Sequence, residues 1–211
     1  MENVNYYLKY LDELEIINKE EKKPTLLLHA CCGPCSTAVL AELTNFFDIT
    51  IYYYNPNIYP ESEYEKRYDQ FKLIPQVKLI EKCDYNDQEF YNAIKDVDNY
   101  DKLKEGGKRC HECYKLRLEK TCKYAKDNNF DYFSTTLSIS PYKNSNWINE
   151  IGIELMEKYN IKFLYSNFKK KEGYKKSIAY SKEYGLYRQE YCGCKYSLEE
   201  MKNYLSDKEK Q

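Results

Sequence analysis

The sequence predicts an α/β fold: one domain with a mostly parallel sheet flanked by helices. Short apolar and β-branched runs of strand length alternate along the chain with longer amphipathic segments of helix length. The 211 residues can bury one ordinary core, and they contain neither an internal repeat nor a long linker. Strands and helices that alternate in this way form a parallel sheet, because each helix carries the chain back across it.

The first half of the chain is expected to contribute three strands. Residues 25–30, TLLLHA, form a continuous apolar run that is typical of a strand buried on both faces. Residues 48–56 form a second strand that ends at Pro56, because proline cannot continue a central ladder. A third strand is expected at residues 76–84. The helices between and after these strands are expected at residues 36–47, 59–74 and 86–97.

The second half is expected to begin with a long helix, residues 109–129, after two consecutive glycines. A strand at residues 130–138, a helix at 144–160 and a strand at 161–166 complete the sheet. The remainder is basic and rich in tyrosine, with a last short helix, SLEEMKNYL. We therefore expect an α/β catalytic domain over residues 25–200. A helical extension, 1–24, precedes it and a helix end and tail, 201–211, follow it.

Composition excludes some functions. The formal net charge is −1, so the chain has no overall basic field for nucleic acid, although a local basic patch is compatible with it. There is no run of about 18 apolar residues, and the polar N-terminus has no apolar signal core. We therefore expect a cytoplasmic protein with no membrane partner.

Cysteine is the most informative residue type in the sequence. Nine cysteines in a cytosolic chain indicate metal binding or redox chemistry, because the cytosol keeps structural thiols reduced. The loop after the first strand lies at the carboxyl edge of the sheet, where such folds bind ligands. Seven cysteines fall into three compact groups, one of them in this loop: Cys31, Cys32 and Cys35; Cys110 and Cys113; Cys192 and Cys194.

The number of these cysteines limits the metal. A structural zinc takes four ligands, and a cubane iron–sulfur cluster usually takes four cysteines. Seven thiols therefore suggest one four-ligand site with spare thiols, or a cluster with a second metal beside it. Cys83 lies in a strand pattern and Cys122 faces away from Cys113 on the long helix. We interpret these two as small buried apolar residues.

Two other functions use the same residues. Cys32-Gly33-Pro34-Cys35 is the dithiol pattern of a thioredoxin-like thiol–disulfide exchanger, and Pro75 follows where such a protein has a proline. The remaining cysteine groups would then have no role. The second alternative is a zinc-stabilised RNA-binding module, which would need the cysteines but no catalysis and would be colourless.

Five segments together resemble the epoxyqueuosine reductase family of the QueH type. These segments are LLLHACCGPCS, YYYNPNIYP, RCHECYKLRL, FSTTLSISPYKN and GYKKSIAYSKEYGLYRQEYCGCKYS. The resemblance implies a Rossmann-like sheet similar to the nucleotide α-hydrolase (HUP-like) domains. It also implies reduction of the epoxide of epoxyqueuosine, at the wobble position of tRNA, to queuosine. The cysteine loop replaces the ATP-binding loop of the HUP-like relatives, so we expect no use of ATP.

The same resemblance implies the cofactors, a 4Fe–4S cluster and a mononuclear iron beside it. Their ligands would be the seven grouped cysteines, although some family members carry aspartate in place of Cys35. The sequence does not divide the seven between the two metals. Two electrons and two protons are needed to remove the epoxide oxygen as water, so we also expect an external electron donor.

The remaining candidate residues surround these cysteines in the sequence. Candidates for proton donation are Tyr191, Tyr142 and His29, where the alternative for His29 is a histidine satisfied within the strand end. Candidates for contacts with the nucleoside or with tRNA phosphates are Asn55, Tyr59, Arg188, Lys108 and Arg109. Tyr53 and Tyr54 are further candidates for stacking on a flipped base, and residues 169–176 form a second basic stretch. For any single lysine the alternative is a solvated surface charge.

Overall fold

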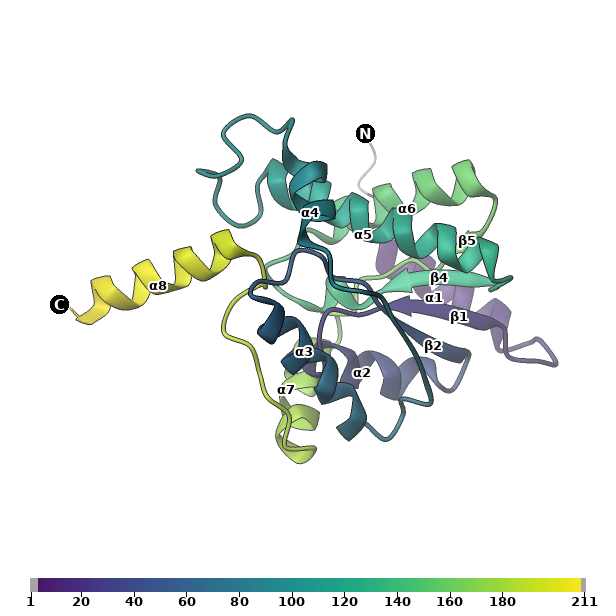
Figure 1. Ribbon diagram of the computed structural model, residues 1–211. Helices are drawn as coiled ribbons and strands as arrows, with labels where there is room; N and C mark the ends of the chain where they lie inside the picture. Colours follow the sequence, from purple (N-terminus) through teal and green to yellow (C-terminus); the bar gives the residue numbers. More distant parts are fainter. Residues whose placement is uncertain (1–3, 210–211) are drawn as a thin grey trace.

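The structure, a computed structural model, describes residues 4–209 and contains one five-stranded sheet in which every pairing is parallel (Figure 1). The strand order is β3-β2-β1-β4-β5, so β1 is central and the order reverses beside it. The predicted fold class is therefore confirmed. The strands are β1 (Thr25–His29), β2 (Asp48–Tyr53), β3 (Leu79–Lys82), β4 (Tyr132–Thr135) and β5 (Lys162–Phe163).

Two apolar cores lie on the two faces of the sheet. Leu26 and Leu28 of β1 pack into one core and Leu27 packs into the other, as the alternation of side chains along a strand requires. All three leucines are fully buried, which explains why this strand reads as a continuous apolar run.

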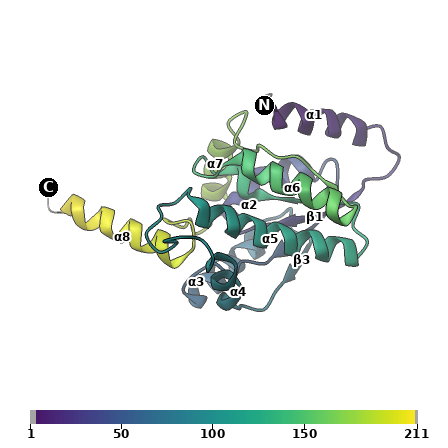
Figure 2. The ribbon, with the colours of Figure 1, turned by 90° about the horizontal axis from the view of Figure 1, so that it is seen from above.

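The helices cover both faces (Figure 2). One face carries α1 (Tyr6–Ile17), α2 (Gly33–Leu43), α3 (Glu61–Asp69) and α7 (Gly173–Glu183). The other carries α4 (Asp87–Ile94), α5 (Lys108–Asp127) and α6 (Ser145–Tyr159). Two 3₁₀ helices, η1 (Gln70–Leu73) and η2 (Thr136–Ile139), follow α3 and β4. The last helix, α8 (Lys195–Glu209), extends away from the sheet.

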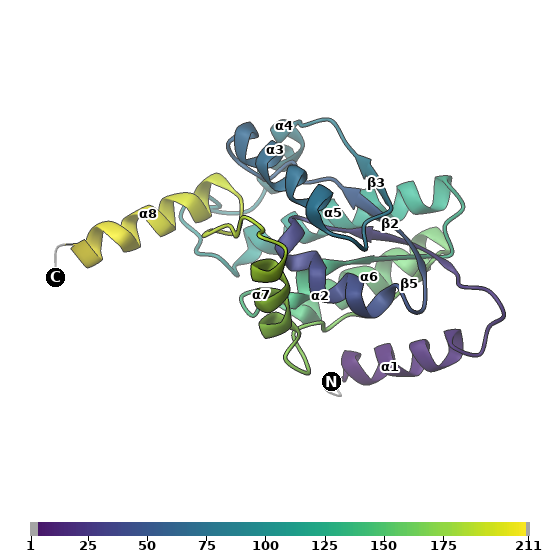
Figure 3. The same cartoon turned by 90° about the horizontal axis from the view of Figure 1, so that it is seen from below.

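Helix α7 was not predicted, because it has almost no apolar stripe. The residues that it buries are Gly173, Ser177 and Ser181. These small side chains let α7 lie closely against α2, with which it makes the most extensive helix–helix contact in the described chain (Figure 3). Such packing leaves no hydrophobic periodicity in the sequence.

The start of α2 also differs from the prediction. The helix begins at Gly33 rather than at residue 36, with Pro34 in its first turn, where its missing N–H leaves no hydrogen bond unmade. Cys35 therefore belongs to the first turn of the helix. No helix among residues 4–209 is long and apolar enough to cross a membrane.

Candidate metal centre

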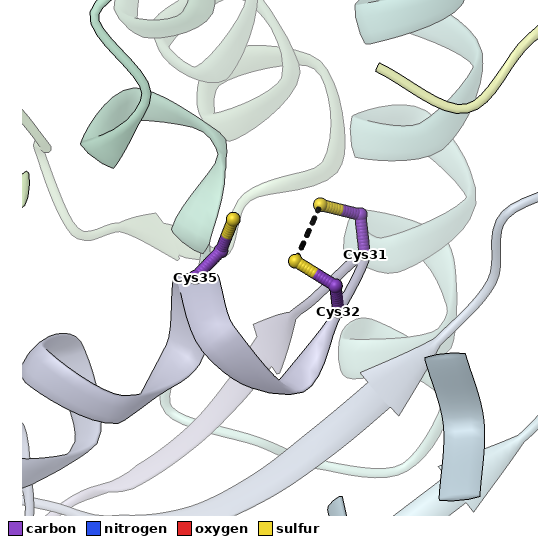
Figure 4. A group of neighbouring side chains, drawn as sticks. All are labelled: Cys31, Cys32 and Cys35. Carbon is purple, nitrogen blue, oxygen red and sulfur yellow. Dashed lines mark hydrogen bonds between the residues drawn. The ribbon is translucent and has the colours of Figure 1, made fainter. Parts of the chain in front are cut away.

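Three cysteines of the loop after β1 converge at the carboxyl edge of the sheet (Figure 4). The Sγ atoms of Cys31, Cys32 and Cys35 all lie within 4.8 Å of one another. Cys31 and Cys32 are buried, and their Sγ atoms are 3.9 Å apart. Cys32 is the extended residue that precedes α2. The tight change from strand to helix therefore directs the three thiols to one point beside the central strand, where the strand order reverses.

Close packing around Gly33 fixes this turn. A Cβ atom at Gly33 would lie 2.8 Å from Cβ of Gln70, which is closer than side-chain carbons approach one another. Glycine therefore lets the start of α2 lie against η1. The helix N-terminus, with its partial positive charge, then lies at the thiols and favours their ionised form.

The three thiols titrate unequally. Hydrogen bonds from Cys32 and Cys35, with the positive charges of Lys143 and Arg117, hold the pKa of Cys31 well below its usual range. Burial raises the pKa of Cys32 well above its usual range. The hydrogen bond with Cys31 raises the pKa of Cys35 to about 11. Without a cation, three buried thiolates would repel one another, whereas a bound metal would compensate their charge.

The second and third cysteine groups lie in the same region. Cys110 and Cys113 are on the first turns of α5, and Cys110 packs in the apolar core that contains Cys31 and Cys32. Cys113 packs with Cys194 in a small cluster that is completed by Phe90 and Ile94. Helix α5 and the loop before α8 therefore bring their cysteines together, although about eighty residues separate them in the chain.

The loop that carries Cys192 and Cys194 is held by backbone contacts. Gly193 has φ of +140°, a conformation that L side chains rarely adopt. The Gly193 carbonyl accepts a hydrogen bond from the Tyr59 N–H at 2.8 Å. The Tyr191 hydroxyl donates to the Tyr59 carbonyl at 2.5 Å. The segment before α3 therefore fixes the direction in which the two thiols point.

Arg67 of α3 also binds the loop that carries Cys192 and Cys194. Its guanidinium is fully buried, and Nη1 and Nη2 donate to the carbonyl oxygens of Cys192 and Tyr191 at 3.0 and 3.2 Å. Nε donates to Glu63 at 2.7 Å, so the charge of the arginine is compensated within its own helix. Sequence patterns did not point to Arg67.

A cavity of about 570 Å³ opens at the first and third cysteine groups. Cys31, Cys35 and Cys192 contribute to its wall, as does one side of the first turns of α8. The side chains from the other segments that line it are Glu105, Ser140, Tyr142, Lys143, Tyr174, Arg188, Gln189, Glu190 and Tyr191. A volume of this size is within the usual range of small-molecule sites.

Lys143 is a second residue that sequence reasoning missed. It is only 8% exposed and lines the cavity, and it forms no ion pair with a carboxylate within residues 4–209. Burial opposes its charge, but the thiols Cys192, Cys31 and Cys35, in their ionised form, favour the charged lysine more than burial opposes it, and the pKa of Lys143 is raised. A buried lysine without a carboxylate partner is rare and expensive, so its position in a cysteine-lined cavity is a sign of function.

Three of the predicted side chains lie at the cavity and others do not. Tyr142, which is 75% exposed, Tyr191 and Arg188 all line it. Burial raises the pKa of Tyr191 to about 12. Nη1 of Arg188 donates to the Ser177 carbonyl of α7 at 3.2 Å and to the Ser181 hydroxyl at 3.0 Å, which ties this side chain to α7 through two of its five N–H donors.

His29 is fully buried at the end of β1. Its Nε2 lies 3.1 Å from the Tyr54 carbonyl, which can only accept, so Nε2 carries the proton. Its Nδ1 then accepts from the Thr135 hydroxyl at 2.8 Å. Burial lowers the pKa of His29 to about 3. These contacts agree with the alternative of a histidine satisfied within the strand end.

The predicted substrate contacts at the end of β2 are mostly internal. Asn55 is fully buried and donates to the Ala30 carbonyl at 2.9 Å, which ties the end of β2 to the cysteine loop. Tyr53 and Tyr54 are also buried, so stacking of a base on these two rings was a wrong expectation. Tyr59 is 39% exposed and remains accessible to a base.

The two basic residues before Cys110 have different positions. Lys108 is exposed. Arg109 is buried, and its guanidinium donates to the carbonyls of Tyr100 and Leu103 at 2.6 Å and pairs with Glu200 at 3.5 Å. The expectation that Arg109 contacts tRNA phosphate does not agree with this position, since the guanidinium is already used to hold residues 100–103 and α8.

The two remaining cysteines are separate from the three groups. Cys122 is fully buried in the core between α5 and α6, and its thiol donates to the Leu155 carbonyl at 3.8 Å. Cys83 is half-buried at the end of β3 and packs against the same core. Both positions agree with the interpretation as small apolar residues.

The donor set fits a thiophilic metal group. Cysteine sulfur selects zinc or iron–sulfur species over magnesium or calcium. Three sulfurs within 4.8 Å form one side of such a site. Of the other grouped thiols, Cys192 lines the same cavity and Cys110 packs in the same apolar core, while Cys113 and Cys194 pack in a separate small cluster. The cations Lys143 and Arg117 offset the charge of thiolates. Fold and site together define an α/β protein with a cysteine group that could hold a metal ion at the reversal point of a Rossmann-like sheet.

Comparison with known proteins identifies the family. The family model for epoxyqueuosine reductase QueH matches residues 26–200. The epoxyqueuosine reductase QueH of Streptococcus pyogenes serotype M1 is 40% identical over 205 residues, which cover 93% of this chain and 79% of that protein. The same enzyme of Thermotoga maritima is 41% identical over 179 residues, covering 82% of this chain and 90% of that protein. The chain therefore belongs to the epoxyqueuosine reductase QueH family.

Proposed function

We propose that this protein reduces the epoxide of epoxyqueuosine in tRNA to the cyclopentene of queuosine, with a 4Fe–4S cluster and an adjacent iron as cofactors. It is an oxidoreductase by its family. The observation that carries the proposal is the cavity in which Cys31, Cys35 and Cys192, from distant parts of the chain, lie beside the buried Lys143.

The seven grouped cysteines would hold the two metal groups. Loss of the epoxide oxygen as water takes two electrons and two protons. When bound, the cluster and the iron supply single electrons and a Lewis-acidic position for the epoxide oxygen. The electrons come from an external donor protein or reductant.

Residues of the chain itself supply charge and protons at the cavity. Lys143 retains its proton. Its positive charge would stabilise negative charge on the cysteine sulfurs of the cavity and on the oxygen that leaves the epoxide. The Tyr191 hydroxyl, which donates to the Tyr59 carbonyl, and the exposed Tyr142 hydroxyl are the other proton donors in the wall. His29 would act by holding β1 and the end of β2 together rather than by donating a proton.

Contacts with tRNA are assigned to exposed cations outside the wall of the cavity. Lys108 lies at the start of α5, and Lys170, Lys171 and Lys176 lie in or before α7. Lys169 has another role, because its Nζ donates to the Lys143 carbonyl at 2.7 Å. Exposed Tyr59 and Tyr142 are the aromatic rings on which an extruded base would stack.

Anaerobic purification with metal analysis tests the cofactor assignment. We expect a brown protein with broad visible absorption and more than four irons per chain. A colourless protein with one zinc after anaerobic reconstitution would support the RNA-binding module instead. A metal-free protein that exchanges disulfides through Cys32 and Cys35 alone would support the thioredoxin-like alternative.

A further inference from the structure

The side-chain amide of Gln189 contacts two of the three clustered thiols. Its Nε2 atom lies 3.0 Å from Sγ of Cys32 and 3.7 Å from Sγ of Cys35. Gln189 also lines the cavity, to whose wall the half-buried Cys35 contributes. It comes from the segment between α7 and the Cys192 loop and reaches across about 155 residues of sequence.

The orientation of the amide follows from the chemistry of sulfur. A thiolate or a metal-bound sulfur has no proton and can only accept a hydrogen bond, so the NH₂ group must face Cys32 and Cys35. The opposite atom, Oε1, is buried and has no hydrogen-bond partner within residues 4–209. Turning the amide round would place Oε1 against two electron-rich sulfurs and would remove both contacts.

Hydrogen bonds within the chain hold the segment on the N-terminal side of Gln189. The Tyr187 N–H donates to the side chain of Gln70 at 2.8 Å. Arg188 is bonded to Ser177 and Ser181 of α7. The two residues before Gln189 are therefore held to η1 and α7, which places Gln189 where its side-chain amide reaches the two sulfurs.

We propose that Gln189 is a positioning residue that donates amide hydrogen bonds to the sulfurs of Cys32 and Cys35 and thereby raises the reduction potential of the metal group that they hold. The inference rests on the proposed function, because it takes these sulfurs as ligands of a redox group. A hydrogen bond to a ligand sulfur draws electron density away from it. The reduced, more negative state gains more from this contact than the oxidised state, which raises the potential.

The test is a reductive titration of the anaerobic, iron-loaded protein followed by visible absorption and electron paramagnetic resonance. Gln189→Leu removes the donor at similar size, and we expect a more negative potential at unchanged iron content. Gln88→Leu is the matched control, because Gln88 is exposed on α4, and it should keep the wild-type potential. A wild-type potential in Gln189→Leu overturns the proposal.

Two further variants keep the test decisive if Gln189→Leu does not assemble the metal group. The reduction potential of Gln189→Ala is measured in the same way, and we expect the same shift to a more negative potential. If both lose iron, recovery of iron in Gln189→Asn supports the need for an amide donor, and loss of iron in all three overturns it. A wild-type protein that binds no iron contradicts the proposed function itself, which is a different outcome from equal potentials.

Discussion

The guanidinium of Arg67 holds the carbonyl oxygen of Cys192 at 3.0 Å, across an interval of 125 residues. This contact joins α3, which follows β2, to the loop that carries the third cysteine group. A planar guanidinium can donate to two carbonyls and to a carboxylate at once, which a lysine ammonium cannot reproduce with the same geometry. The direction of Cys192 and Cys194 therefore depends on a residue that binds no metal itself.

Arg67→Lys is expected to lower the iron content and the activity of a protein that still folds. The lysine keeps a positive charge near Glu63. It loses the two N–H donors that bind the carbonyl oxygens of Tyr191 and Cys192. Iron per chain, read beside the far-ultraviolet circular dichroism, checks this. Lys66→Arg is the control, because Lys66 lies on the same helix, with its ammonium over the Tyr187 ring and no bond to the Cys192 loop. Full iron content in Arg67→Lys would show that iron binding does not need the hydrogen bonds from Arg67 to the Cys192 loop.

Cys113→Ala and Cys194→Ala are each expected to abolish reduction of epoxyqueuosine in tRNA, while Cys83→Ala stays near wild type. Cys113 and Cys194 pack together between α4 and α5, whereas Cys83 lies apart from them at the end of β3. The measurement is the amount of queuosine formed in tRNA by each variant at equal protein concentration. Activity in either of the first two variants would contradict a shared site.

Lys143→Gln is expected to slow turnover by roughly 100- to 1,000-fold, the range for loss of one preorganised charged or hydrogen-bonding group. Its ammonium is the buried cation of the cavity wall, and a neutral amide would leave the charge of Cys31 and Cys192 less compensated. Lys143→Arg should recover part of the rate. The exposed Lys158→Gln serves as control. A wild-type single-turnover rate in Lys143→Gln would remove the lysine from the mechanism.

Replacement of Lys170, Lys171 and Lys176 together by glutamine is expected to weaken tRNA binding and to flatten its dependence on salt. Each phosphate contact that is lost should reduce the slope of log affinity against log salt by about 0.7 to 0.9. Binding of the same tRNA across a series of salt concentrations measures this slope. Lys9→Gln, on α1, provides a control outside the cluster. An unchanged slope in the triple variant would place the tRNA elsewhere.

The sheet and the cysteine loop could be predicted because both leave local signals. A strand buried on both faces, such as Thr25–His29, is a continuous apolar run, and the thiols that follow it must lie at the carboxyl edge of a parallel sheet. Cys110 and Cys113 were placed on one helix face by spacing alone. In each of these cases the structure follows from residues that are neighbours in the sequence.

The rest of the site could not be predicted because its residues act at long range. Arg67 and Gln189 reach the cysteines across 125 and 157 residues, and neither stands in a local pattern that distinguishes it from a surface side chain. Lys143 stands in SPYKN, where a single lysine is ordinarily solvated. Arg109 was placed on the surface for the same reason, although its guanidinium is buried.

Turnover of epoxyqueuosine-containing tRNA by the anaerobic, iron-loaded protein with a chemical reductant tests the central claim most directly. Mass spectrometry of the nucleosides should show loss of one oxygen and conversion to queuosine, in proportion to the reductant consumed at two electrons for each nucleoside. Heat-denatured protein and reductant alone should leave the epoxide intact. A fully iron-loaded protein that binds this tRNA but leaves the epoxide unreduced would contradict the proposed function.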